Sequence, residues 1–458
     1  MQWLEARVVP IFKRKGNPSD PSNYRPISIT SSCCKVLETI IRKEMTAFLD
    51  SENLIHNQQH GFRQNRSTMT NLMNAVNRWE RNVDNNKEIH CAFLDFAKAF
   101  DTVSHPKLIH KLERYGLSGH LLKWISIFLS DRSQIVSICS IQSTRVKVLS
   151  GVPQGTVLGP LLFIIFANDL PDVSLPSVDL DLFADDTKLS TVVEEKNTSS
   201  LPFYRTMISA HTWSDIWQVY FAAKKCSVMC IGSRSTKLGY RLGDEVIQQV
   251  TEATALGVLI SSNLKFSGHC EKISKSGMRK VGLIYKAFLC RDEQFLVSMF
   301  KIFIRPSLEY CSPVFNPYLL KDIDLIENVQ RTFTRRIPGL SQLSYPARLI
   351  VLKLESLEER RIKFDLIFIY KLIHGLIELN FDDFFVYSQR NYELRRHQFD
   401  LRPARHHSNW LKQSISCRPI DCWNKLRADV VNAPNLNAFK RLLNKVELRS
   451  FCKGRGIQ

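Results

Sequence analysis

Alternating apolar and polar positions predict a strand that ends just before two adjacent carboxylates. Val178, Leu180 and Leu182 alternate with polar residues, a pattern typical of a half-buried strand. Asp185 and Asp186 follow almost at once. Neighbouring carboxylates repel each other, and their oxygens are the ligands that Mg²⁺ prefers. Asp also favours tight turns, so the pattern alone leaves both a metal site and a polar hairpin tip open.

A second apolar run lies upstream and ends at another carboxylate. Residues 89–94 are mostly apolar without a helical period, which predicts a buried strand, and Asp95 follows them. Phosphoryl transfer of the polymerase type uses two metal ions about 4 Å apart, held between acidic groups. We therefore expect Asp95 and Asp185 to come together, although ninety residues separate them, with Asp186 close behind. Asp101 is expected to be a capping or turn residue.

The spacing of apolar residues predicts helices through much of the remaining chain. Helices are expected over 35–49, 67–79, 107–129 (two helices broken at Gly116 and Gly119), 161–170 and 211–219, and through most of the chain after 268. Residues 134–148 alternate in part and predict a hairpin.

Several blocks, in a fixed order, resemble reverse transcriptases. The blocks are 23–30, 60–68, 89–101 (motif A), 150–160 (motif B), 183–186 (motif C, Phe-Ala-Asp-Asp), 224–226 (motif D) and 256–258 (the primer grip). The residues in these blocks are most similar to those of non-LTR, LINE-type retrotransposons of the Jockey and CR1 kind. Segments 305–313 and 423–426 resemble regions that follow the polymerase in such elements. No endonuclease-like segment precedes the blocks, so we expect either a fragment of a larger element or a truncated gene.

The resemblance implies an α+β fold of the right-hand polymerase type with a helical C-terminal extension. Fingers would occupy residues 1–88, and a palm with a small antiparallel sheet would occupy 89–232. The primer grip and helical thumb would span 233–300, and a basic helical domain 301–458. The arginine pairs at 335–336, 360–361 and 395–396 would lie either on solvated helix faces or, for some of them, against the template.

The resemblance also implies roles for individual residues. Asp95, Asp185 and Asp186 would hold two Mg²⁺ ions, with Mn²⁺ as an alternative, and Lys225 would assist the pyrophosphate leaving group. The nucleotide-binding residues would be Arg63, Arg66, Phe96, Phe100, Gln154 and Gly155. Arg63 and Arg66 could bind triphosphate oxygens or make structural ion pairs, and Arg25 is a further candidate.

Phe100 bears on the choice between DNA and RNA synthesis. In the resembling family this aromatic residue lies under the sugar of the incoming nucleotide, where a ring leaves no room for a 2′-hydroxyl group. The alternative is that Phe100 is a core residue at the end of the strand. Ala222 departs from the family pattern, which has Asn at that position, and this change could weaken activity.

Composition agrees with a nucleic-acid-binding protein. A formal charge of +19 and an isoelectric point near 9.4 favour a polyanionic partner, here an RNA template with a DNA primer and dNTPs. The 12 cysteines lack paired metal spacing, and the absence of a signal peptide predicts an intracellular protein without membrane association. Two other readings stay open, a catalytically silent RNA-binding protein and an RNA-synthesising polymerase.

Overall fold

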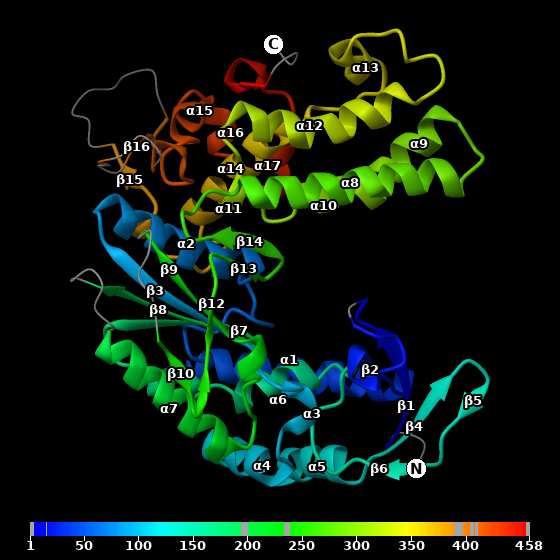
Figure 1. Cartoon of the computed structure of the whole chain (residues 1–458), viewed down its shortest axis with the longest axis vertical. Coiled ribbons are helices and arrows are strands. Elements are labelled where there is room, and N and C mark those ends of the chain that lie inside the picture. Colours follow the sequence, from blue (N-terminus) through cyan, green and yellow to red (C-terminus); the bar gives the residue numbers. More distant parts are fainter. Residues whose placement is uncertain are drawn as a thin grey trace. The chain divides into compact units, whose positions relative to one another are not determined.

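The computed structural model describes most of the chain as two compact units. The described residues are 4–14, 16–193, 200–232, 239–388, 397–403, 407 and 411–454. The first unit comprises Met1–Ser67, His90–Val228 and Thr236–Val250, and the second comprises Thr68–Ile89, Met229–Ser235 and Thr251–Gln458. Figure 1 labels the helices and strands. The predicted division into four domains stays an interpretation of the sequence.

A five-stranded sheet carries the two predicted strands. Its order is β12-β9-β3-β8-β7, with β3 at Glu88–Leu94, β7 at Val178–Phe183, β8 at Asp186–Val193, β9 at Ser227–Ile231 and β12 at Gln248–Gln249. Strands β7 and β8 form an antiparallel hairpin in which Phe183 pairs with Asp186. Strand β3 is buried at every position except Phe93, in agreement with its apolar sequence.

Another sheet, which lies within the first unit, precedes motif B in the sequence. It contains β1 (Glu5–Phe12), β2 (Tyr24–Ile29), β4 (Ser133–Ile138), β5 (Ile141–Gln142) and β6 (Val146–Lys147). Strand β1 pairs antiparallel with β2 and parallel with β4, while β4 pairs antiparallel with β5 and with β6. The hairpin predicted over 134–148 is thereby confirmed.

The helices of the first unit match most of the predicted ones, although α7 begins ten residues before the predicted 211–219 and α3 was not predicted. They are α1 (Ser32–Ser51), α3 (Ala99–Thr102), α4 (His105–Arg114), α5 (Gly119–Ser130), α6 (Gly159–Phe166) and α7 (Leu201–Trp217), with a short hairpin of β10 (Arg241–Leu242) and β11 (Glu245–Val246). Pro160 lies in the first turn of α6, where a backbone N–H is not needed. All of α6 except Pro160 is buried, so this helix is the centre of the unit's core.

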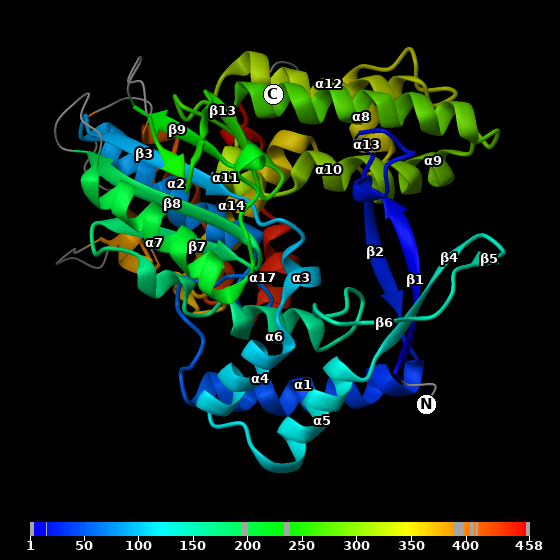
Figure 2. The ribbon, with the colours of Figure 1, turned by 60° about the horizontal axis from the view of Figure 1, so that its bottom comes forward.

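The second unit is mostly helical. Its elements are α2 (Thr68–Asp84), β13 (Glu252–Ala255), β14 (Val258–Ser261), α8 (Ser267–Ala287), α9 (Glu293–Met299), a π-helical segment at Phe300–Ile304, α10 (Arg305–Glu309), α11 (Ser312–Phe315), α12 (Leu320–Arg335), α13 (Tyr345–Val351), α14 (Leu357–Ile373), β15 (Val386–Tyr387), β16 (Leu401–Arg402), α15 (Ile420–Asn424), α16 (Ala428–Val431) and α17 (Leu436–Leu443). Helices α8 and α12 run side by side (Figures 1 and 2) over a core that includes Phe300 and Phe333. In the described part of the chain, no helix is both long and apolar enough to cross a bilayer.

One of the predicted basic clusters points inward. Arg361 is 1% exposed, and the guanidinium group of Arg360 forms an ion pair with Glu309. The pair at 360–361 is therefore neither a solvated face nor a template contact, because its charges are engaged inside the second unit. Arg335 and Arg336 are exposed, as predicted, and the pair at 395–396 lies outside the described residues.

A buried carboxylate fixes the start of α6. Glu38 of α1 is fully buried, and its Oε2 accepts hydrogen bonds from the backbone N–H groups of Val157 (2.6 Å) and Leu158 (3.0 Å). The first N–H groups of a helix lack partners within the helix and carry partial positive charge, so a carboxylate is well matched to them. Through this contact α1 holds the end of the motif B loop.

We predict that Glu38→Ala destabilises the first unit by about 1–3 kcal/mol, because buried N–H groups lose their acceptor. The measurement is the melting temperature of the purified protein. Glu44→Ala is the matched control, since Glu44 lies exposed on the same helix. Equal melting temperatures for the two variants would contradict the anchoring role of Glu38.

Candidate active site

Three carboxylates come from neighbouring strands of the five-stranded sheet. Asp95 follows the last residue of β3, and β3 lies beside β8. Asp186 is the first residue of β8, while Ala184 and Asp185 form the turn that joins β7 to β8. Ala184 has a φ of +54°, which tightens this turn. The strand order thus places the ends of motifs A and C on neighbouring strands, and the joint role of the three carboxylates stays a prediction.

The carboxylates influence one another electrostatically. Burial raises the pKa of Asp185, the negative charge of Asp95 raises it further, and the positive charge of Arg25 lowers it. Burial and the charges of Asp185 and Asp95 together raise the pKa of Asp186 to about 6. Full ionisation of this group is therefore costly without a cation. Carboxylate oxygens are the ligands that a hard divalent cation such as Mg²⁺ prefers.

Gln59 supports the turn that carries Asp185, and sequence reasoning missed it. Its side chain is fully buried, and Oε1 accepts hydrogen bonds from the N–H groups of Gly61 (2.7 Å) and Ala184 (3.0 Å). The backbone reinforces this contact, because Leu182 N–H donates to Gln58 O and His60 N–H donates to Leu182 O. A single glutamine carries no motif, so no pattern in the sequence marked it.

Backbone contacts also hold Asp95. The N–H of Ala222 donates to Asp95 O at 2.7 Å, and the N–H of Asp95 donates to Cys226 Sγ at 3.4 Å. Lys225 Nζ lies 4.0 Å from Asp95 Oδ2, so the motif D lysine is beside the carboxylates. The contact of Ala222 uses only its backbone, and it therefore survives the departure from the family's Asn.

Motif B brings further predicted residues to this region. The half-buried ring of Phe100 stacks on Phe163 of α6, with 4.4 Å between ring centroids. Gln154 Nε2 donates to Asp101 Oδ1 at 3.2 Å. Gly155 is exposed with a φ of +107°, and a Cβ there would lie 2.6 Å from Ser28 O, so only glycine fits.

Three of the predicted nucleotide-binding residues have structural contacts. Phe96 is 3% exposed and stacks on Phe221 at 4.3 Å between centroids, so it is a core residue and the prediction of a nucleotide contact is corrected. Arg63 donates to His56 O at 3.2 Å, and Arg66 donates to Gln59 O at 3.2 Å. These contacts favour the structural reading of Arg63 and Arg66, and a triphosphate role for either stays a prediction.

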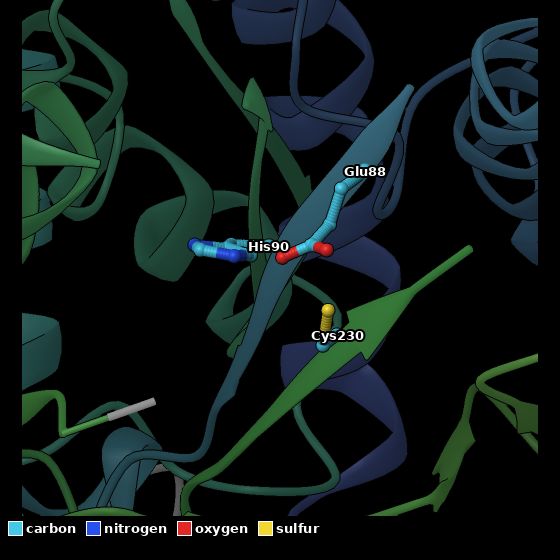
Figure 3. A group of neighbouring side chains, drawn as sticks. All are labelled: Glu88, His90 and Cys230. Atoms are coloured by element: carbon cyan, nitrogen blue, oxygen red, sulfur yellow. The ribbon is translucent and has the colours of Figure 1, made fainter. Parts of the chain in front are cut away.

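A second group of potential metal ligands lies on β3 and β9. The ligand atoms of Glu88, His90 and Cys230 lie within 4.8 Å of one another, and Figure 3 shows the three side chains on the two strands. All three side chains are buried, and His90 Nδ1 is 2.7 Å from the hydroxyl oxygen of Tyr240. A structural zinc site has four ligands, and a catalytic one keeps an open position. Three groups are one ligand short of a structural zinc site, and His90 Nδ1 already pairs with Tyr240, so we assign no ion to them.

Comparisons with known proteins agree with this geometry. A family profile described as "Reverse transcriptase (RNA-dependent DNA polymerase)" matches residues 12–260, more than half of the chain. The RNA-directed DNA polymerase from mobile element jockey of Drosophila melanogaster is 28% identical over 347 residues, which cover 74% of this chain and 38% of that protein. The probable RNA-directed DNA polymerase from transposon X-element of the same species is 27% identical over 346 residues, with coverages of 74% and 38%.

The chain spans about 38% of the length of these curated relatives. Apo telomerase from Candida tropicalis aligns with 81% of this chain and 67% of its own, at 12% identity and a TM-score of 0.45. The resemblance to non-LTR elements of the Jockey kind, predicted from the sequence blocks, is confirmed.

We predict that Gln59→Leu lowers the melting temperature and weakens divalent-cation binding. Loss of the Oε1 acceptor leaves the N–H groups of Gly61 and Ala184 unpaired, which costs about 1–3 kcal/mol. Gln58→Leu is the matched control, since Gln58 contacts the hairpin through its backbone. Calorimetric titration with Mn²⁺ measures the cation affinity, and an affinity equal in both variants would contradict a positioning role for Gln59.

Proposed function

The chain belongs to the reverse transcriptase family, and from this premise we propose that it synthesises DNA on an RNA template from dNTPs. The observation that carries the proposal is the meeting of Asp95, Asp185 and Asp186 at the ends of paired strands. In the reaction, the primer 3′-hydroxyl oxygen bonds to the α-phosphorus of the nucleotide, and the bond to pyrophosphate breaks. The hydroxyl proton leaves to solvent or a base.

We propose Mg²⁺ as the natural ion, in two positions, with Mn²⁺ as an alternative. Asp95, Asp185 and Asp186 would hold the ions through carboxylate oxygens. When bound, such ions lower the pKa of the attacking hydroxyl and stabilise the leaving oxygens. The raised pKa of Asp186 supports this assignment, because bound cations would favour the ionised carboxylates.

The residues around the carboxylates have separate proposed tasks. Lys225, beside Asp95, would neutralise or protonate the leaving pyrophosphate. Gln154 would contact the incoming nucleotide near its 3′-hydroxyl, and Gly155 would allow its backbone to come close. Phe100 would exclude a 2′-hydroxyl, because its ring is only half buried and is backed by Phe163. Backing by a second ring limits how far Phe100 can move aside.

The partners and setting of the reaction are part of the proposal. The jockey and X-element relatives support a non-LTR retrotransposon protein that uses an RNA template and a DNA primer. The formal charge of +19 supports binding of nucleic acid. The rival function, a catalytically silent RNA-binding protein, rested on Ala222. The backbone contact of Ala222 with Asp95 weakens that rival, since it needs no Asn side chain.

We predict that Asp185→Asn abolishes primer extension while RNA affinity stays within about twofold, because basic residues elsewhere carry the binding. Extension of a DNA primer on an RNA template measures activity, and a filter-binding titration measures RNA affinity. Asp172→Asn is the control, since Asp172 is a surface acid whose Oδ1 lies 3.9 Å from His56 Nε2. Full activity of Asp185→Asn would exclude a metal-ligand role, and an inactive wild-type protein would support the silent alternative.

We predict that Phe100→Val lets the protein accept ribonucleotides. Truncation of the ring frees the space that a 2′-hydroxyl needs, and a misfit of this size costs about 1–3 kcal/mol, or roughly ten- to a hundredfold in rate. The measurement is the ratio of kcat/KM for dGTP and GTP on one primer–template. A ratio equal to that of the wild-type protein would remove Phe100 as the sugar gate and reopen RNA synthesis.

A further inference from the structure

Asp101 has a contact that a capping residue would not have. It lies in the short helix α3, six residues after Asp95, and its carboxylate oxygen Oδ1 accepts a hydrogen bond from Gln154 Nε2 at 3.2 Å. Burial raises the pKa of Asp101, while the bond from Gln154 lowers it, so this bond favours the ionised carboxylate. The sequence predicts only a capping or turn residue at this position.

The bond determines which end of the Gln154 amide remains available. An ionised carboxylate can only accept hydrogen bonds, so the amide must present its NH₂ group to Asp101. The carbonyl oxygen Oε1 is then the group left for a ligand, and no described residue donates a hydrogen bond to it. A carbonyl oxygen accepts from a hydroxyl group, which is the group that an incoming nucleotide carries at its 3′ position.

Both partners of this bond are fixed by backbone contacts. Val152 N–H donates to Phe100 O at 2.7 Å, and Ser150 Oγ donates to Asp101 O at 3.0 Å. Gly151 has a φ of +91°, and a Cβ there would lie 2.7 Å from Asp101 O. On the other side, Gln154 O accepts from Ser28 N–H at 2.7 Å. These contacts therefore fix the position of the motif A helix α3 relative to the motif B loop.

We propose that Asp101 is a positioning residue that orients the Gln154 amide so that Oε1 accepts a hydrogen bond from the 3′-hydroxyl of the incoming nucleotide. Asp101 itself touches neither substrate nor metal. Its effect is selection: nucleotides with a 3′-hydroxyl are preferred over 3′-deoxy analogues. This inference rests on the proposed function, because it assumes that a nucleoside triphosphate binds beside Gln154.

The test compares dGTP with ddGTP, which lacks the 3′-hydroxyl. We expect Asp101→Ala to reduce the ratio of their kcat/KM values about tenfold, the usual effect of one lost hydrogen bond, mainly through a higher KM for dGTP. Asp101→Asn should restore most of the ratio, because its amide oxygen can still accept from Gln154 Nε2. Asp50→Ala, an exposed acid of α1, is the control and should keep the wild-type ratio. An equal loss for both nucleotides in Asp101→Ala would indicate a purely structural role and overturn the proposal.

A double-variant comparison asks whether Asp101 acts through Gln154. Gln154→Ala should reduce the same ratio, and adding Asp101→Ala should reduce it no further. Separate, additive reductions would overturn the proposal, because Asp101 would then select the nucleotide by another route.

A second experiment separates this inference from the proposed function. It measures nucleotide binding to the protein complexed with a primer that ends in a dideoxynucleotide, which has no 3′-hydroxyl to form the new phosphodiester bond. We expect the wild-type complex to bind dGTP about tenfold more tightly than ddGTP, and Asp101→Ala to bind both equally. If this holds while the wild-type protein fails to extend a normal primer, the proposed synthesis fails and the inference stands. If extension succeeds but the binding ratio is the same in both proteins, the inference alone is overturned. If neither nucleotide binds, both are overturned.

Discussion

The repulsion between three neighbouring carboxylates is the constraint on which the first unit is built. The charge of Asp95 raises the pKa of both Asp185 and Asp186, and the charge of Asp185 raises the pKa of Asp186 further. Each is therefore placed at the end of a strand or in a tight turn, where the backbone has little freedom. The strand order and the β7–β8 hairpin hold the backbone of these residues in place against the repulsion. Rigid placement of this kind is what a two-ion site requires.

The supports of that arrangement act mainly on the backbone. Gln59 accepts from the N–H of Ala184 in the turn, and Ala222 donates to the carbonyl of Asp95. Glu38 binds two N–H groups at the start of α6. Contacts to backbone atoms fix where a side chain begins without touching the side chain itself. The backbone at each aspartate is thus held in place, while these supports leave the carboxylate groups available.

The sequence predicted the helices and strands better than it predicted the buried polar residues that support them. The strands before Asp95 and Asp185 follow from apolar runs, and most helices follow from periodicity, because both patterns report burial directly. Gln59 and Glu38 could not be found in this way. A polar residue is predicted to be exposed as long as the partner that would allow its burial is unknown. The nucleotide contact predicted for Phe96 rested on its place next to Asp95 in the sequence. Successive side chains along an extended chain point in opposite directions, so sequence neighbours need not face the same site. The ring of Phe96 faces Phe221 in the core.

Contacts in the structure show which basic residues form interior ion pairs and which lie exposed. Within the second unit Arg360 pairs with Glu309 and Arg418 pairs with Asp365, and such pairs contribute nothing to the net charge. The formal excess of +19 must therefore reside on groups outside these pairs. Helix α8 is one such place, because Lys272 and Arg279 lie exposed two turns apart on one face. A charge excess carried by exposed side chains is available to a phosphate backbone, and the binding it provides weakens as salt rises. The interior pairs, by contrast, stabilise the helical unit itself, so arginine content alone is a poor guide to where this chain meets nucleic acid.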